Sequence, residues 1–490
     1  MAFANNDGTW ASDQQTAFNN IVNAGRWEGT PDGGAGVNEN ESADWSQGDK
    51  SKSLGRDSAS ADTNRKVDWH LLDYQSPGQV NRLVSALVGT HVQLPCVDND
   101  DGWSTWIQAQ NVGITDTGVI VFFWGNYSGL CRSRDPGPIG HACQSVPEDG
   151  VWTLKAAIPS AAKSAIAYSV REDKFEAACK KAGKVDNSKE WREWVDKYHQ
   201  KYHGEPLAVT VSRSGPNDFG TTVSSAYTGV CEKMVGGNHP YGYFVPYAMK
   251  AYHGLDTEMV IQNSGQECTS VWIYYRQQGL AAFAYAQHIE SLAPGESLRT
   301  RVPAVPQLND TDPWLGAAYI TAGEPLGIVV DQTSFDLYPG SYDRGTLLSH
   351  RAQPWKPQND TTLYADLVYR EFSGWSASIQ VQNVSQSALP TFVTVDFMNA
   401  SGDEILFLGE WVDRGGSKTF YLPAVVELGF NYLGAAVIRS HDQIDYPANY
   451  QSAGQPIVAV VDLKGGGDAE GMDAQGGSYN AHSLSEKEWV

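Results

Sequence analysis

The sequence predicts an all-β protein: three tandem antiparallel β-sandwiches of the Ig-like class, with an extended N-terminal arm and one helical insertion in the first sandwich. Three observations support this fold class. An eight-residue phrase occurs three times, other short motifs accompany each copy in the same order, and segments of alternating apolar residues lie between them. Several motifs repeated in one order are typical of a repeated structural unit.

The repeated phrase is predicted to form a central strand of each sandwich. It reads GEPLAVTV at Gly204–Val211, GEPLGIVV at Gly323–Val330 and GQPIVAVV at Gly454–Val461. A short apolar run that is entered by a turn is typical of a buried strand. Because proline fixes φ and donates no hydrogen bond, it belongs at the first position of such a strand.

A Gln-Asn dipeptide and an alternating segment precede each copy of the phrase. The dipeptides end at Asn111, Asn263 and Asn383. The segments after them carry apolar side chains at every second position: Val119, Val121 and Phe123; Val271, Ile273 and Tyr275; Val393, Val395 and Phe397. Since successive side chains of a strand point to opposite faces, each segment turns one face to a core. Each repeat is therefore predicted to be a sandwich of roughly 100 to 120 residues.

The repeats place the domain limits at 66–232, 233–352 and 353–490. The first repeat also carries an insertion at residues 171–203 that is predicted to be helical. Its apolar residues follow the i, i+3, i+4, i+7 spacing of one helix face. These residues are Trp191, Trp194, Val195, Tyr198 and Tyr202. Asn187 with Glu190 three positions later forms a capping box, which marks the start of a helix.

Residues 1–65 are polar, rich in glycine and weakly patterned, so they cannot bury enough apolar surface to fold alone. Two interpretations are open: a flexible leader, or an arm that becomes ordered against a neighbouring subunit by strand addition or wrapping. The start of the chain, MAFANNDGTWASDQQ, lacks the basic and apolar regions of a secretory signal. The sequence leaves open whether a leader was removed or another export route is used.

Composition excludes two classes of partner. The chain has 490 residues, with 35 Lys and Arg against 57 Asp and Glu, and its net charge is −22. Since a nucleic-acid binder needs a basic surface, we expect no nucleic-acid partner. No apolar run approaches the roughly 18 residues of a membrane-spanning helix, so no membrane span is expected.

The six cysteines include no CxxC pair, which argues against a zinc ribbon or a thioredoxin-like site. Cys131 and Cys143 flank a loop rich in proline and glycine, and we predict a disulfide between them. Such a bridge favours an oxidising compartment. Two unrelated thiols are the alternative, and the other four cysteines allow three pairings that stay open.

Two clusters are weak candidates for binding a metal. Asp98, Asp100 and Asp101 lie within DNDDGW and could hold Ca²⁺, although they lack the spacing of an EF-hand loop. A solvated turn is the alternative, since aspartate favours turns. His199 and His203 lie four residues apart on the insertion, but the glutamate of an HExxH site is missing. Histidines of a surface or an interface are the alternative there.

The sequence contains no recognisable motif for catalysis or for binding a cofactor. GxSxG is absent, and the glycine-rich GGGDAEG lacks the Lys-Ser/Thr of a phosphate loop. We therefore expect a protein that is not an enzyme. Among the Asn-x-Ser/Thr sequences, Asn126 and Asn399 follow alternating strands within turn-like segments, and they are glycosylation candidates if the chain is extracellular. Turn formation is the competing explanation for both asparagines.

The order GW…IQVQN, alternating strand, YLPA, LGAAVI, QPIVAVV and SYNA resembles a repeat of bacterial exported cell-surface and appendage proteins. In that family, tandem β-sandwich units carry a strand that begins with tryptophan and ends in Gln-Asn. The resemblance covers the second and third repeats and, less completely, the first, but neither the arm nor the insertion. It implies an exported protein of the cell surface without catalysis.

These observations together predict a non-enzymatic structural subunit that self-assembles into an extracellular filament, sheath or surface layer. The N-terminal arm and the insertion of the first sandwich would contact other copies, and head-to-tail contacts would generate a polymer. Two alternatives are open. One is a glycan-binding or adhesive surface protein, since exposed aromatic rings suit sugar binding. The other is a viral capsid or decoration subunit.

Overall fold

The computed structural model describes residues 88–126, 131, 137–216, 222–231, 241–252, 255–280, 285–308, 313–334, 347–354, 360–385, 389–442, 454–465 and 475–482, and the backbone of β1 (Ser53–Gly55) and β2 (His70–Leu72). The chain divides into two compact units, Met1–Ser85 with Lys487–Val490, and Ala86–Glu486. In the first unit, β1 pairs antiparallel with β2. Most of the predicted arm, residues 1–65, lies outside the described residues.

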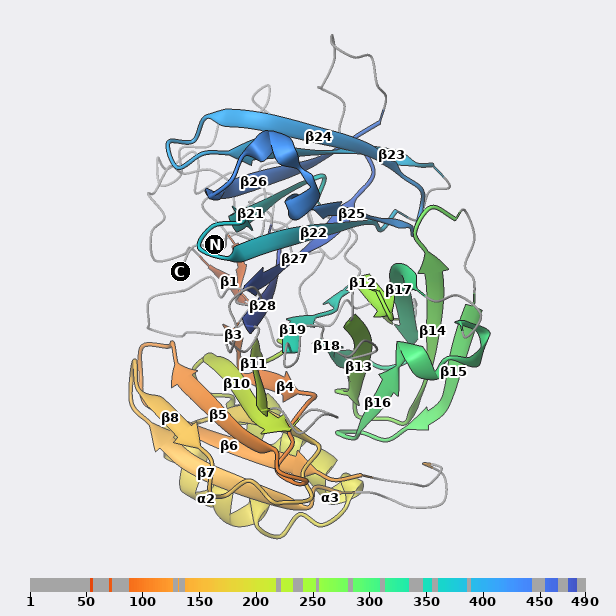
Figure 1. The fold of residues 1–490 in the computed structure, drawn as a ribbon. Coiled ribbons are helices and arrows are strands. Elements are labelled where there is room, and N and C mark those ends of the chain that lie inside the picture. The colour runs from red at the N-terminus through yellow and green to blue at the C-terminus, as the bar shows by residue number, and fades with distance from the viewer. Residues whose placement is uncertain are drawn as a thin grey trace, which may run out of the picture. The chain divides into compact units, whose positions relative to one another are not determined.

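The prediction of an all-β fold is confirmed within Ala86–Glu486. Its described strands form antiparallel sheets in three successive pairs (Figure 1). Both sheets of each pair contribute to one apolar core. We call these pairs the first, second and third sandwich, which are orange to yellow-green, green, and teal to blue in Figure 1. The domain limits 66–232, 233–352 and 353–490 stay a prediction, since Ala86–Glu486 forms one compact unit.

The first sandwich combines a sheet of order β11-β10-β5-β8, with β3 beside β10, and a sheet of order β4-β9-β6-β7. Its strands are β3 (Val88–Gly89), β4 (His91–Leu94), β5 (Ser104–Asn111), β6 (Thr117–Trp124), β7 (Gly140–Val146), β8 (Val151–Leu154), β9 (Ser164–Arg171), β10 (Leu207–Pro216) and β11 (Thr222–Thr228).

The insertion at residues 171–203 is helical, as predicted. It contains α2 (Glu172–Ala182), α3 (Ser188–Trp194) and the π-helical η5 (Val195–Gln200). Asn187 caps α3, because its side chain accepts a hydrogen bond from the backbone N–H of Glu190 at 2.9 Å. Trp191 and Trp194 pack with Phe122 of β6 in a second apolar cluster on the outer face of the sheet. The apolar helix face is therefore buried on its own sandwich.

The second and third sandwiches repeat one plan. Their sheets have the orders β15-β14-β17-β12-β20 and β16-β13-β18-β19 in the second, and β21-β26-β23-β24 and β25-β22-β27-β28 in the third. The second contains β12 (Tyr241–Lys250), β13 (Leu255–Asn263), β14 (Thr269–Gln277), β15 (Tyr285–Leu292), β16 (Ser297–Arg301), the 3-10 turns η6 (Val302–Ala304) and η7 (Pro306–Leu308), β17 (Trp314–Ala322), β18 (Leu326–Ser334), β19 (Leu347–Arg351) and β20 (Gln353–Pro354). The third contains β21 (Thr362–Arg370), β22 (Trp375–Asn383), β23 (Thr391–Met398), β24 (Glu404–Val412), β25 (Ser417–Tyr421), η8 (Leu422–Ala424), η9 (Val426–Leu428), β26 (Tyr432–His441), β27 (Ile457–Gly465) and β28 (Gln475–Asn480).

The repeated phrase forms the central strands β10, β18 and β27, as predicted. Each pairs with the Gln-Asn strand in one register: Leu207 faces Asn111, Leu326 faces Asn263, and Ile457 faces Asn383. The opening glycine of the third copy, Gly454, has no room for a side chain, because a Cβ atom would lie 2.4 Å from the backbone N of His441. None of the helices in the described residues is long and apolar enough for a membrane span.

The asparagine of the Gln-Asn motif holds the turn after its strand. Asn263 Nδ2 donates to the carbonyls of Glu267 and Leu292 at 2.8 and 2.9 Å. Its Oδ1 accepts from the backbone N–H of Gly265 at 2.9 Å. The asparagines of the other two repeats make corresponding bonds. A buried side chain that satisfies three backbone groups explains why the motif recurs.

We expect Asn263→Ala to lower the free energy of unfolding by about 2 to 3 kcal/mol, because it leaves buried backbone groups without partners. Urea denaturation measures this loss. The matched control is Asn399→Ala, since Asn399 Oδ1 also accepts two backbone N–H groups, those of Ser401 and Asp403, but in an exposed turn. Water can replace those bonds, so the control should cost less than about 1 kcal/mol. Equal losses in the two variants would contradict this role.

Candidate functional site

The three sandwiches meet at two junctions. We call the contact between the first and second sandwiches the first junction, and the contact between the second and third sandwiches the second junction. Both are built from the same positions of the repeat. Gln262 Nε2 donates to the carbonyl of Ala165 in the preceding sandwich at 3.2 Å, and Gln382 Nε2 donates to that of Ala318 at 3.4 Å. The two alanines lie opposite corresponding residues of the alternating strands. Both glutamines are fully buried. The glutamine of the Gln-Asn motif thus fastens each sandwich to the one before it.

A buried ion pair crosses the first junction. Arg213 of β10 donates from Nη2 to both carboxylate oxygens of Asp331 in β18, at 2.8 and 3.0 Å. The hydroxyl of Ser349, on the strand beside Asp331, donates to the same carboxylate at 2.6 Å. Although burial alone would raise it, the Arg213 guanidinium holds the pKa of Asp331 below its ordinary value. The first sandwich therefore compensates a charge buried in the second.

The second junction has the same carboxylate without the arginine. Asp462 follows the phrase in the third repeat as Asp331 does in the second, and Ser478 on the adjacent strand donates to it at 2.5 Å. At the place of Arg213, however, the second repeat has Gln332. Burial raises the pKa of Asp462 to about 7, against the lowering effect of Ser478 and of the nearby Gln332 amide.

Several buried polar atoms at the second junction have no hydrogen-bond partner within the described residues. They are Asp462 Oδ2, both amide atoms of Gln332, His350 Nε2 and Asn480 Oδ1. Because buried polar groups are almost always paired, such a group of atoms indicates a place for water or for a ligand.

A cavity of about 630 Å³ between the second and third sandwiches includes Asp462 in its wall. Aromatic side chains form much of this wall: Tyr247, Tyr252, Tyr421 and Phe430. Tyr247 is buried at 5% exposure, whereas Phe430 is exposed at 77%. The volume and the mixture of aromatic walls with a few polar groups are those of a small-molecule site.

The second junction also brings a serine, a histidine and an aspartate together. Ser478 Oγ lies 3.3 Å from His350 Nδ1 and 2.5 Å from Asp462 Oδ1. In a catalytic triad the histidine lies between the acid and the nucleophile. Here the serine lies between the other two, so the arrangement cannot relay a proton from serine through histidine to the acid. The three residues instead make a polar contact across the junction.

Two of the three aspartates that could hold Ca²⁺, Asp98 and Asp100, lie beside the side-chain nitrogen of Lys163. Both oxygens of Asp100 accept from Lys163 Nζ at 2.7 Å, and Asp98 lies 3.6 Å from the same nitrogen. Asp98 also pairs with Arg299 of the second sandwich. Asp101 is exposed in the turn, with φ of 50°. The calcium site stays a prediction, and these contacts assign Asp98 to the first junction.

The predicted disulfide between Cys131 and Cys143 is wrong. Cys131 is bonded to Cys268, which links the first sandwich to the second, and Cys143 is bonded to Cys179 of the insertion. The prediction rested on the short distance between the two cysteines in sequence. Cys143, however, lies on β7 with its side chain on the outer face of the sheet, which α2 covers. Cys96 and Cys231 form no disulfide within the described residues.

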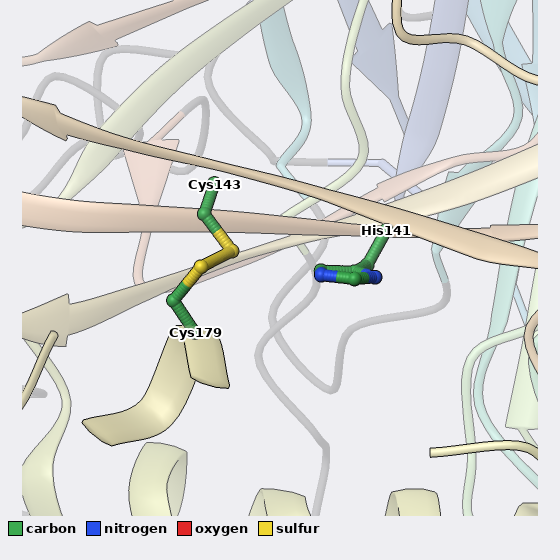
Figure 2. A group of neighbouring side chains, drawn as sticks. All are labelled: His141, Cys143 and Cys179. Carbon is green, nitrogen blue, oxygen red and sulfur yellow. A yellow bond between two sulfur atoms is a disulfide. The ribbon is translucent and has the colours of Figure 1, made fainter. Parts of the chain in front are cut away.

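His141 lies beside the Cys143–Cys179 bridge (Figure 2). The ligand atoms of the three residues lie within 4.8 Å of one another, as in a metal site. Both sulfurs, however, are bonded to each other, and a metal needs them as thiolates. In the oxidised chain this group therefore fastens α2 to β7.

The remaining predicted site residues are two histidines and two asparagines. His199 Nε2 lies 2.9 Å from the carbonyl of Thr90, and the backbone of His203 bridges to Val170. Metal binding by the two histidines stays a prediction. Asn126 is exposed after β6. Asn399 holds the turn after β23, as the competing explanation for it requires. Glycosylation of either asparagine stays a prediction.

Comparisons with known proteins leave the chain without a family. No protein-family model matches it, and no curated protein matches it in sequence. One similar solved structure is a Ca²⁺-stabilised adhesin that helps an Antarctic bacterium reach out and bind ice, at 10% identity and a TM-score of 0.10, covering 80% of this chain and 73% of that one. Another is a 1.5-MDa bacterial ice-binding adhesin retained at a host cell surface, also at 10% identity and a TM-score of 0.10, covering 82% and 98%. Such scores do not indicate a shared fold.

Asp462→Asn should make the protein more stable above pH 7 and leave its stability unchanged near pH 4. The raised pKa means that the folded state binds the proton more tightly, so the contribution of Asp462 is present below the unfolded pKa of 3.8 and is lost as pH rises through about 7. The gain at pH 8.5 has an upper limit of about 4 kcal/mol. Urea denaturation at pH 4 and pH 8.5 measures it. Asp331→Asn is the matched comparison and should destabilise at pH 8.5; a loss of stability in Asp462→Asn at that pH would contradict the account.

Proposed function

We propose that this chain is a non-enzymatic structural protein of the cell surface that assembles with copies of itself into an extracellular filament, sheath or surface layer. The pair of equivalent junctions supports a structural role, because it joins three sandwiches through fully buried contacts. The observation that carries self-association is the exposed apolar row on edge strand β24. The disulfide between Cys131 and Cys268 adds a covalent link at the first junction. Two disulfides favour an oxidising compartment outside the cytosol.

We expect the contact between copies to differ from the repeat junction. Val260 and Val329 of the second sandwich pack into the apolar core cluster of the first. The corresponding outward positions of the first sandwich carry Gln108 and Thr210 instead. A polar outer face is typical of the terminal unit of a repeat array. We therefore place the contact between copies elsewhere.

Strand β24 of the third sandwich is the surface that favours self-association. It lies at the edge of its sheet, and Ile405, Phe407 and Trp411 are 47%, 39% and 48% exposed on one face of it. An edge strand with exposed apolar side chains is a template for pairing with another chain. A second copy could extend this sheet and cover the apolar row.

We expect the double substitution Phe407→Lys with Trp411→Lys to convert assemblies into folded monomers, because two charges would be placed in the contact. Light scattering and electron microscopy of the purified full chain measure assembly. Val151→Lys, at a site on edge strand β8 of the first sandwich that is 57% exposed, is the matched control and should assemble normally. Deletion of residues 1–65 tests the predicted arm in the same way, and normal assembly of that truncation would show that the arm is not required.

A second candidate function, glycan binding, is favoured by one aromatic surface. Trp272 is 40% exposed and stacks on His288 at 4.1 Å between ring centroids, with Tyr274 and Tyr319 in parallel beside it. Flat aromatic faces of this kind suit the apolar face of a sugar ring. Binding of a glycan array by a monomer, lost in Trp272→Ala, would support this function over assembly.

A further inference from the structure

The two junctions differ in positive charge: at the first, Arg213 and Arg299 both act on Asp331, whereas the corresponding positions at the second carry Gln332 and Thr419. At the first junction, the Arg213 guanidinium lies against Asp331, and the cross-strand Ser349 completes the hydrogen bonds of the carboxylate. At the second junction, Asp462 keeps the cross-strand serine but faces Gln332. Since an amide carries no charge, the second carboxylate has no cation from the preceding sandwich.

The missing cation leaves one carboxylate oxygen without a partner. Asp462 is buried at 5% exposure, and its Oδ2 makes no hydrogen bond within the described residues. The equivalent carboxylate at the first junction accepts bonds on both oxygens. A proton, a water molecule or a cation that reaches it would stabilise a buried carboxylate in this state.

Asp462 also lies in the wall of the cavity at the second junction. The charged groups of that wall are Glu371, Asp462 and Lys464, and the Arg370 guanidinium lies beside it, over the Phe430 ring and 3.7 Å from Glu371. Since Glu371 is already paired with that arginine, Asp462 is the carboxylate of the wall that is left for a cation. Tyr247 and Tyr421 add aromatic faces, which attract organic cations. Near Asp462, His350 is buried and its pKa is lowered to about 4, so it supplies no positive charge at neutral pH.

We propose that the cavity between the second and third sandwiches binds a small organic cation, a compound with a guanidinium or primary ammonium group, which pairs with Asp462 in the place that Arg213 takes at the first junction. The apolar body of such a compound would lie against the tyrosines, and its charged group would donate to Oδ2. Binding would bridge the two sandwiches, as the arginine bridges the first two.

Butylguanidinium and butylurea are matched probes, because they share their shape and differ in charge. Isothermal titration of the full chain at pH 8 should show binding of butylguanidinium and none of butylurea. The affinity for butylguanidinium should be about thirtyfold weaker at pH 5.5, since a carboxyl with a pKa of about 7 is then mostly protonated. Equal affinity for the two probes, or no binding of butylguanidinium at millimolar concentration at pH 8, would overturn the proposal.

Two variants locate the binding. Gln332→Arg places a guanidinium of the chain itself against Asp462, so it should raise the melting temperature at pH 8 and abolish binding of butylguanidinium. Asp462→Asn should abolish binding without filling the site. Asp442→Asn removes an exposed carboxylate elsewhere in the third sandwich and should bind normally. If butylguanidinium still binds to both folded variants, Gln332→Arg and Asp462→Asn, the ligand lies elsewhere and the inference is refuted. The inference is also refuted if the cavity binds methyl glucoside and not the cation, because the site would then be one for a neutral sugar.

Discussion

The compensation of buried charge between neighbouring sandwiches is the interaction on which the arrangement of this chain depends. A carboxylate that is taken out of water costs several kcal/mol unless a cation and hydrogen bonds replace its hydration. Asp331 obtains both, from Arg213 of the first sandwich and from its own neighbour Ser349. Arg213 also lies near Asp98 and donates to Ser225 in its own sandwich, and Arg299 acts on Asp331 within the second. The pair is therefore the contact through which a network of buried charges crosses the junction.

The remainder of each junction is carried by the motifs that define the repeat. The asparagine of Gln-Asn holds a turn inside its own sandwich, while the glutamine beside it bonds to the preceding one. The same dipeptide therefore stabilises the fold of its own sandwich and binds that sandwich to the preceding one. The third sandwich is attached by the same geometry as the second, but Gln332 and Thr419 stand at the places of Arg213 and Arg299, which both act on Asp331. Asp462 therefore lacks those two cations, and burial raises its pKa to about 7.

The sequence predicted the periodic features and missed those that depend on tertiary contacts. Alternation and repeated phrases gave the all-β class, the central strands and the helical insertion, because each rests on neighbours along the chain. The Cys131–Cys268 bridge spans 137 residues and depends on how two sandwiches meet, which spacing does not report. The two junction carboxylates did carry a signal: Asp331 and Asp462 both follow the repeated phrase. Their importance was hidden because their partners lie in other repeats.

A double-mutant cycle on Arg213→Gln and Asp331→Asn measures the central interaction most directly, with the free energy of unfolding determined by urea denaturation at pH 7. Each single variant leaves one buried polar partner unsatisfied and should cost about 3 to 5 kcal/mol. The double variant recreates an amide pair and should cost much less than the sum, giving a coupling energy of at least about 2 kcal/mol. Additive losses, with a coupling energy near zero, would show that the sandwiches are not held together by this charge pair.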